Sequence, residues 1–227
     1  MRVSIGVDEA GRGCAIGCLF VAAAAFKEED LDSLRYMGVV DSKKLTRARR
    51  EELAATIKKL AAAVEVVAIE PSVIDSMNLN LAEAEAVKKA LKLLVVKLRV
   101  QGYEVARVVV DLFGPRRLVE GAVREACPEA ELILEHDADE KFVECSAASI
   151  VAKVLRDRHI DELKRRLGDF GSGYPSDRKT EEWIRRYYEE HGSLPDCVRR
   201  TWRTVKQAAP SEYKPKPRRA PPPPHTP

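Results

Sequence analysis

The first thirteen residues constrain the fold most strongly, because a short apolar segment leads directly into two adjacent carboxylates. Residues 2–7 have the pattern of a buried strand, and Asp8, Glu9 and Gly11-Arg12-Gly13 follow. Burying acids at a strand end is unfavourable unless a positive charge compensates them, and hard divalent cations bind carboxylate oxygens. The glycine–arginine segment suits the close approach of an anion to backbone amides. This stretch therefore predicts both a metal site and a phosphate-binding loop.

Two later apolar segments also end in acids. Residues 108–110 precede Asp111, and residues 131–135 precede Asp137 and Asp139. Sites in open α/β sheets lie outside the carboxyl ends of the strands, so these acids converge with the first pair if the three strands are neighbours. An all-carboxylate cluster suits Mg²⁺ or Mn²⁺, and two such ions about 3.5–4 Å apart serve phosphodiester hydrolysis. A single acid after a strand is ordinarily a loop residue, but three such strands favour a metal site.

The remaining pattern predicts an α/β fold with a five-stranded mixed sheet flanked by helices. Residues 17–26 and 64–69 supply the other two strands, and the first of these forms an antiparallel hairpin with the opening strand. Glu83 stands where a capping box would place it at the start of a long helix. The predicted helices cover residues 46–63, 80–100, 115–127, 141–167, 177–190 and 198–207.

We expect three regions in the chain. Residues 1–168 form a catalytic domain, residues 169–207 form a small C-terminal helical lobe, and residues 208–227 form a flexible, proline-rich basic tail. The net charge is +3, but five basic residues and one acid lie from Lys206 onward, so the rest of the chain carries −1. Nucleic-acid binding therefore requires a local basic patch and not bulk charge.

Composition narrows the class of protein. The chain has 227 residues, of which 45% are hydrophobic and 33% charged, as in soluble globular proteins. No apolar run reaches membrane-spanning length, so we expect a cytoplasmic protein. Its five cysteines are scattered, which argues against a disulfide framework and against a structural zinc site.

Several motifs together resemble those of type 2 ribonuclease H, the ribonuclease HII family, in its archaeal form. The resemblance covers about residues 3–180. It is carried by Gly6-Val7-Asp8-Glu9-Ala10-Gly11-Arg12-Gly13, Asp41-Ser42-Lys43-Lys44-Leu45, Val110-Asp111, Ala138-Asp139, Ser146-Ala147-Ala148-Ser149-Ile150-Val151-Ala152-Lys153-Val154 and Gly171-Ser172-Gly173-Tyr174-Pro175-Ser176-Asp177.

The resemblance implies an RNase H-like fold and a metal-dependent endoribonuclease. Such an enzyme hydrolyses the RNA strand of RNA–DNA hybrids and cuts at ribonucleotides embedded in duplex DNA, leaving a 3′-hydroxyl and a 5′-phosphate, with two Mg²⁺ or Mn²⁺ ions. Asp8, Glu9, Asp111 and Asp139 fall on the family's catalytic, metal-binding carboxylates. Asp137 is an extra acid relative to the family, and the sequence leaves open an exchange of roles with Asp139.

The resemblance also assigns nucleic-acid contacts. The glycine–arginine loop grips the backbone at the ribonucleotide, where the 2′-hydroxyl distinguishes RNA from DNA. The tyrosine packs on the neighbouring sugar, and small hydroxyls and a lysine on one helix face track phosphates. Without the resemblance, the residues alone leave other interpretations open. The loop could be a simple hairpin turn, the tyrosine an aromatic packed in the core of the small lobe, and the helix stripe an ordinary solvated face. The assigned residues are Gly11, Arg12, Gly13, Lys43, Ser146, Ser149, Lys153 and Tyr174.

Other features leave alternatives open. His136 is placed for a supporting role beside the acids, whereas His159 has the pattern of an ordinary helix residue. Some archaeal members carry a sliding-clamp-binding motif, but no glutamine–aliphatic–aromatic pattern follows Gln207, which argues against clamp binding. A monomer is the default expectation. Competing functions are another metal nuclease on the same fold and a catalytically silent hybrid-binding protein, and the intact acids argue against the latter.

Overall fold

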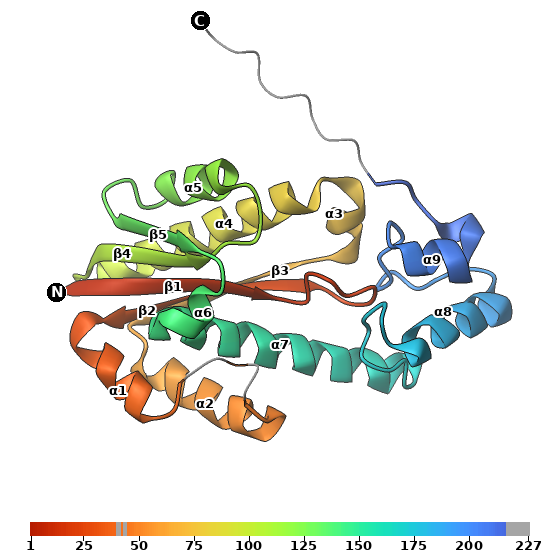
Figure 1. Cartoon of the computed structure of the whole chain (residues 1–227), viewed down its shortest axis with the longest axis horizontal. Helices are drawn as coiled ribbons and strands as arrows, with labels where there is room; N and C mark the ends of the chain where they lie inside the picture. The colour runs from red at the N-terminus through yellow and green to blue at the C-terminus, as the bar shows by residue number, and fades with distance from the viewer. Residues whose placement is uncertain (40–41, 43–44, 217–227) are drawn as a thin grey trace, which may run out of the picture.

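A central mixed β-sheet organises the chain (Figure 1). The computed structural model describes residues 1–39, 42 and 45–216. The strands lie in the order β3-β2-β1-β4-β5, and β1 pairs antiparallel with β2 but parallel with β4, which in turn pairs parallel with β5. The strands are β1 (Arg2–Ala10), β2 (Leu19–Lys27), β3 (Ala63–Ile69), β4 (Glu104–Asp111) and β5 (Glu131–Glu135). The prediction that the three acid-ended strands are neighbours is therefore confirmed.

Helices cover both faces of this sheet, because the strands are apolar on both sides. In β1, Val3, Ile5 and Val7 pack toward α4 and α5, while Ala22, Ala24 and Phe26 of β2 pack toward α2 and α7. Figure 1 shows the two helical layers above and below the strands. The helices are η1 (Glu28–Asp30), α1 (Leu31–Tyr36), α2 (Arg47–Leu60), α3 (Pro71–Ser76), α4 (Leu79–Val100), α5 (Arg116–Arg124), α6 (Ala138–Lys141), α7 (Val143–Leu167), α8 (Arg178–His191), α9 (Arg203–Ala208) and η3 (Pro210–Glu212).

The start of α7 lies in unusually close contact with β1. A Cβ atom on Gly6 would fall 2.0 Å from the carbonyl oxygen of Glu144, so only glycine permits this approach. The Glu144 carboxylate is buried at the same place, where it accepts hydrogen bonds from Ser4 Oγ at 2.7 Å and from Arg107 at 2.6 Å. Gly6 therefore fixes how near the longest helix comes to the strand that carries Asp8.

The structure corrects several predicted boundaries. Strand β1 extends to Ala10, so Asp8 and Glu9 lie within the strand and not after it. Pro71 begins α3, which the sequence analysis did not predict. The capping box is wrong: the side chain of Asn78 caps α4 by accepting a hydrogen bond from the amide of Asn80 at 3.0 Å, and Glu83 is buried. The last predicted helix begins at Arg203 and not at residue 198.

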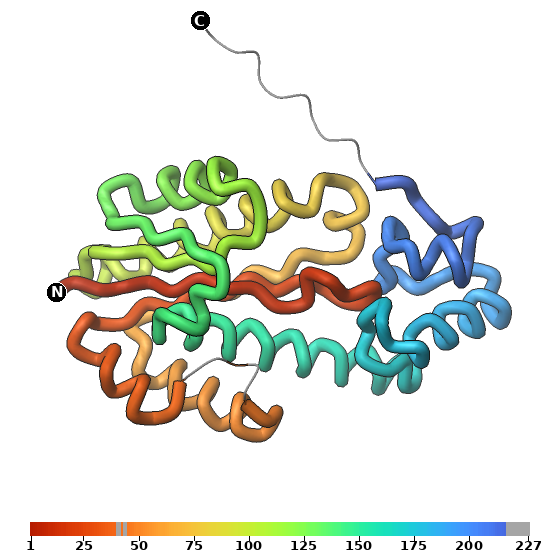
Figure 2. Tube along the Cα trace, in the orientation of Figure 1, coloured from red at the N-terminus to blue at the C-terminus, as the bar shows by residue number. Residues whose placement is uncertain are grey.

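The chain after α7 forms a small lobe with its own apolar cluster. Phe170, Trp183, Ile184 and Val198 pack together, and the segment after β1 reaches into this lobe (Figure 2). Residues 208–216, which we assigned to a flexible tail, pack here too: Ala209 is buried and Tyr213 contacts the cluster.

The structure does not test two predictions about the regions of the chain, the flexible tail after residue 216 and the three-part division. Residues 217–227 of the predicted tail lie outside the described residues. The division of the chain into a catalytic domain, a lobe and a tail stays a prediction. Among the helices of residues 1–39, 42 and 45–216, none combines the length and apolar character needed to cross a membrane.

We predict that Gly6→Ala lowers the free energy of unfolding by about 3 kcal/mol or more, because the added methyl group must displace the backbone of α7. Thermal unfolding followed by circular dichroism measures this loss. Gly121→Ala in α5 is the matched control: its Cβ meets nothing within 4 Å, and alanine favours the helix. Equal melting temperatures for the wild type and Gly6→Ala would contradict the close-packing argument.

Candidate active site

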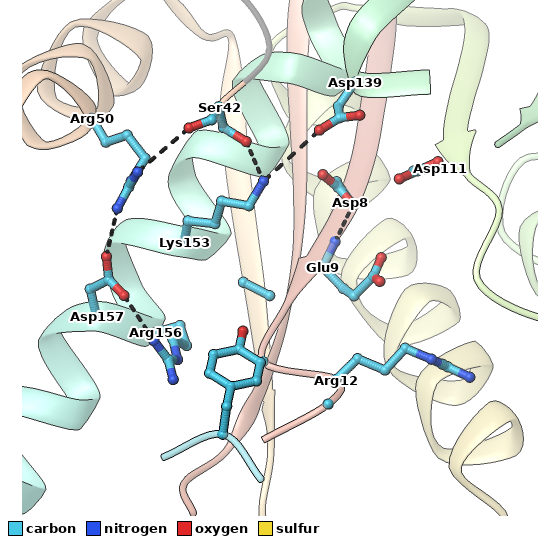
Figure 3. Close-up of a pocket in the computed structure, with 14 residues that line it drawn as sticks. Asp8, Glu9, Arg12, Ser42, Arg50, Asp111, Asp139, Lys153, Arg156 and Asp157 are labelled. Atoms are coloured by element: carbon cyan, nitrogen blue, oxygen red, sulfur yellow. Dashed lines mark hydrogen bonds and ion pairs between the residues drawn. The ribbon is translucent and has the colours of Figure 1, made fainter. Parts of the chain in front are cut away.

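A pocket of about 400 Å³ opens at the carboxyl ends of β1 and β4, beside the C-terminal lobe (Figure 3). Acids occupy one part of its wall, and basic side chains, the glycine–arginine loop and a tyrosine occupy the rest. Its lining residues are Asp8, Glu9, Ala10, Gly11, Arg12, Gly13, Ser42, Arg50, Asp111, Asp139, Lys153, Arg156, Asp157 and Tyr174.

The four predicted acids all reach this pocket. The parallel register pairs Val7 with Val110, so the next residues, Asp8 and Asp111, lie at the same edge of the sheet. Asp139 comes from α6, and its side chain is buried, as is that of Asp8. Figure 3 shows the carboxylates of Asp8, Asp111 and Asp139 together at one end of the pocket. The predicted convergence of strand ends is confirmed.

The structure separates Asp139 from its neighbour Asp137. Asp137 is exposed, in a left-handed conformation with φ of 54°, and it precedes the first turn of α6. That turn carries Asp139 inward, whereas neither Asp137 nor His136 lines the pocket, and His136 is exposed. The geometry therefore assigns the pocket position to Asp139.

Burial and mutual repulsion make Asp8 and Glu9 hard to ionise. Burial raises the pKa of Asp8 well above the ordinary carboxyl range, and the charges of Glu9 and Asp111 raise it further, while a hydrogen bond from Ser149 opposes them. The pKa of Glu9 is also raised, first by burial and then by Asp111, although Arg12 acts in the opposite direction. The positive charge close to Asp8 and Glu9 is therefore too small to stabilise both carboxylates in their ionised forms.

This donor set fits a hard divalent cation, because it contains four carboxylates and neither histidine nor cysteine. In the part of the chain that the structure describes, no three such side chains already stand in metal-binding geometry.

Basic residues of α2 and α7 line the pocket together with the acids. Lys153 Nζ lies 3.9 Å from Asp139 Oδ2 and donates to Ser149 Oγ at 3.0 Å. Arg50 and Arg156 both pair with Asp157, each at 3.1 Å, which fixes their guanidinium groups at the wall. Sequence reasoning missed Arg50, because no local pattern indicates that this face of α2 looks onto the acids.

The two predicted phosphate-binding serines lie behind the wall. Ser146 is buried and donates to the carbonyl oxygen of Asp139, and Ser149 is buried and bonded to Ser42 at 3.0 Å. Neither lines the pocket, so this arrangement favours a role in holding Asp139 and Lys153 over direct phosphate contact. Lys43, the remaining loop candidate, lies outside the described residues.

The glycine–arginine loop lines the pocket, but its guanidinium extends away from the acids (Figure 3). Arg12 pairs with the fully buried Glu83 of α4 and donates to Asn80 Oδ1 at 2.5 Å. Gly11 has a φ of 93°, a conformation that favours glycine, and this turns the chain directly after β1. The sequence analysis did not identify Glu83 as the partner of Arg12, because Glu83 also fits the local pattern of a capping box.

Tyr174 approaches this loop from the lobe. The guanidinium of Arg156 lies 4.8 Å from the centre of its ring, and a Cβ atom on Gly13 would lie 3.7 Å from the ring edge. Burial is the main cause that raises the pKa of Tyr174 to about 12, so the phenol stays protonated at neutral pH. The fold thus brings residues 8–13 and Tyr174 to one pocket. His159 lies outside it, against Phe20.

Comparison with known proteins identifies the group to which this chain belongs. The model of the family described as ribonuclease HII matches residues 5–205. The chain belongs to the ribonuclease HII family. It is 41% identical to a ribonuclease HII of Sulfurisphaera tokodaii over 93% of this chain and 98% of the relative. It is 45% identical to one of Pyrococcus abyssi over 91% of each chain.

Solved structures agree with this assignment. Ribonuclease H2 from Pyrococcus horikoshii OT3 superposes with a TM-score of 0.83 and 39% identity, covering 92% of this chain and 98% of that one. RNase HII from Archaeoglobus fulgidus, solved in complex with PCNA, gives a TM-score of 0.76 and 39% identity over 91% and 96%. A Bst-RNase HIII in complex with Mn²⁺ shares the fold at 22% identity, with a TM-score of 0.78 over 92% and 70%. The RNase H-like fold is confirmed, and ribonuclease HII membership makes this protein an endoribonuclease.

The raised pKa of Asp8 predicts a pH-dependent stability. Between the ordinary and the raised pKa, the folded protein binds more protons than the unfolded chain, so the free energy of unfolding falls as pH rises. In EDTA at pH 7, we expect Asp8→Asn to melt above the wild type, because it removes the cost of burying a charge and the repulsion from Glu9 and Asp111. The expected shift is about 2–4 °C for each kcal/mol gained. The difference should shrink toward pH 4.

Scanning calorimetry across this pH range measures the effect. Asp32→Asn is the control, because Asp32 is exposed, pairs with Arg35 and does not line the pocket, so its Tm should not exceed that of the wild type. A wild type as stable as Asp8→Asn at pH 7 would show that burial and the neighbouring acids do not penalise the ionised Asp8 carboxylate.

Proposed function

We propose that this enzyme cuts the RNA strand of RNA–DNA hybrids and also cuts at single ribonucleotides embedded in duplex DNA. The observation that carries the proposal is the shared pocket, in which four acids, the Gly11–Gly13 loop and Tyr174 meet. Acids alone would suit many nucleases. A glycine-rich loop and an aromatic ring beside them would contact the sugar next to the scissile phosphate and so distinguish ribose from deoxyribose. Such an activity serves the removal of ribonucleotides during DNA replication and repair.

Asp8, Glu9, Asp111 and Asp139 would hold two Mg²⁺ or Mn²⁺ ions. When bound, such ions activate water and neutralise charge on the leaving oxygen, which yields a 3′-hydroxyl and a 5′-phosphate. The all-carboxylate donor set and the raised pKa values of Asp8 and Glu9 support this assignment. The Mn²⁺ bound by the structurally similar Bst-RNase HIII is consistent with it.

The rest of the pocket would orient the nucleic acid. Lys153, beside Asp139, and Arg50, farther along the wall, would offer positive charge to the phosphates on either side of the scissile bond. The backbone of Gly11–Gly13 would meet the 2′-hydroxyl, which is the group that separates RNA from DNA. Tyr174 offers a ring face to the adjacent sugar. These contacts require a hybrid or a mixed duplex as the partner.

We propose that the enzyme acts as a monomer. The Archaeoglobus relative was solved with PCNA, but the segment after Gln207 in this chain has no glutamine–aliphatic–aromatic pattern, so we do not extend that partner to it.

We predict that Asp111→Asn and Asp139→Asn each lower cleavage of a duplex with one embedded ribonucleotide on the order of 10³-fold or more, because each removes an anionic metal ligand. A gel assay with Mg²⁺ or Mn²⁺ measures the rate. Asp137→Asn is the matched control and should stay within about twofold of the wild type, since Asp137 does not line the pocket and asparagine tolerates its left-handed backbone. Cleavage of an all-DNA duplex by the wild type would instead favour a general metal nuclease.

We also predict that Tyr174→Ala lowers kcat/KM at a single ribonucleotide about 10- to 100-fold, the loss expected when an aromatic packing surface is removed. Tyr174→Phe retains the ring and should keep most of the activity. The same gel assay under steady-state conditions separates the two variants. A Tyr174→Phe enzyme as impaired as Tyr174→Ala would assign the role to the hydroxyl and not to the ring.

A further inference from the structure

Arg199 is a fully buried arginine whose guanidinium binds the backbone of the glycine–arginine loop. Its side chain is 0% exposed. Nη2 donates to the carbonyl oxygen of Gly11 at 2.8 Å, Nη1 to that of Arg12 at 3.0 Å, and Nε to that of Gly17 at 2.9 Å. Three bonds from one rigid, planar group fix Gly11 and Arg12, which follow β1, relative to Gly17, which precedes β2.

The segment around Arg199 joins the lobe to this loop by further bonds. The amide of Arg199 donates to the carbonyl oxygen of Ala15 at 2.8 Å, and Ile16 forms a β-bridge with Val198. The indole of Trp202 donates to the carbonyl oxygen of Gly13 at 3.3 Å and lies 5.0 Å from the Arg199 guanidinium. Carbonyl oxygens of the whole Gly11–Gly13 segment are thus held by the lobe.

Holding these carbonyl oxygens also orients the amides of Arg12 and Gly13. In a trans peptide unit, the carbonyl oxygen of one residue and the N–H of the next point in opposite directions within one plane. Because Arg199 holds the oxygens of Gly11 and Arg12 on the lobe side, the N–H groups of Arg12 and Gly13 are directed away from it. Both residues line the pocket that contains the acids.

We propose that Arg199 is a positioning residue for ribose recognition: it fixes the peptide planes of the Gly11–Gly13 loop so that the amides of Arg12 and Gly13 face the 2′-hydroxyl. The proposal rests on the proposed function, since it concerns the loop assigned there to the ribose. Arg199 itself touches no substrate.

Binding measurements test this role apart from catalysis. Fluorescence anisotropy in EDTA gives the Kd for a duplex with one embedded ribonucleotide and for the same duplex in all-DNA form. We expect the wild type to bind the first duplex more tightly. In Arg199→Met, the ratio of the two Kd values should fall about 5- to 10-fold, as expected when one hydrogen bond is misplaced. Arg200→Met is the matched control, because the Arg200 guanidinium binds Leu194 and Glu212 within the lobe. It should retain the wild-type preference.

Three results would overturn the proposal. An unchanged preference in Arg199→Met, or an equal loss of affinity for both duplexes, would show that Arg199 only supports the fold. A wild type that binds both duplexes equally would overturn the assignment of the Gly11–Gly13 loop to the ribose, whereas absence of cleavage in the gel assay with Mg²⁺ or Mn²⁺ would overturn the proposed function. If circular dichroism shows Arg199→Met to be unfolded, Arg199→Lys decides: a reduced preference supports the proposal, because lysine cannot reproduce the planar fork, and an unchanged preference refutes it.

Discussion

Crowding of buried carboxylates at the end of two adjacent parallel strands is the constraint on which the rest of the structure depends. Strand β1 lies at the centre of the sheet, so Asp8 is surrounded by protein and by the negative charges of Glu9 and Asp111. The low-dielectric surroundings make that repulsion strong. Positive charge must therefore be supplied from outside the sheet. Lys153 of α7 provides part of it near Asp139, and a divalent cation would complete it.

The position of α7 decides how that compensation reaches the acids. The helix packs on β1 without intervening side chain at Gly6, and this close approach brings Ser146 and Lys153 beside Asp139. The helix also carries Arg156 to the far wall of the pocket, where it meets Tyr174. The contact between the backbones of Gly6 and Glu144 thus affects both the charge balance and the shape of the site. Gly6 therefore contributes to the site although it does not line the pocket.

Substrate discrimination and bond cleavage come from different parts of the chain. The acids belong to the sheet and to α6, whereas Tyr174 and Arg199 belong to the lobe that follows α7. The Gly11–Gly13 loop connects the two, since it continues from β1 and its carbonyl oxygens are held by the lobe. A loop that rich in glycine would otherwise sample many conformations. Rigid support from a buried arginine is a physical way to keep such a loop in register with the acids.

The sequence by itself determined the five strands, most of the helices and three of the pocket acids, Asp8, Glu9 and Asp111, because apolar strands and the residues that end them are local patterns. Family motifs added the loop and Tyr174. Only the tertiary structure decided that Asp139 and not Asp137 enters the pocket, since the choice depends on a left-handed turn and the helix that follows it. It likewise revealed Glu83 as the partner of Arg12, Arg50 as part of the wall and Arg199 as the support of the loop. These contacts join residues far apart in the chain, and no local spacing encodes them.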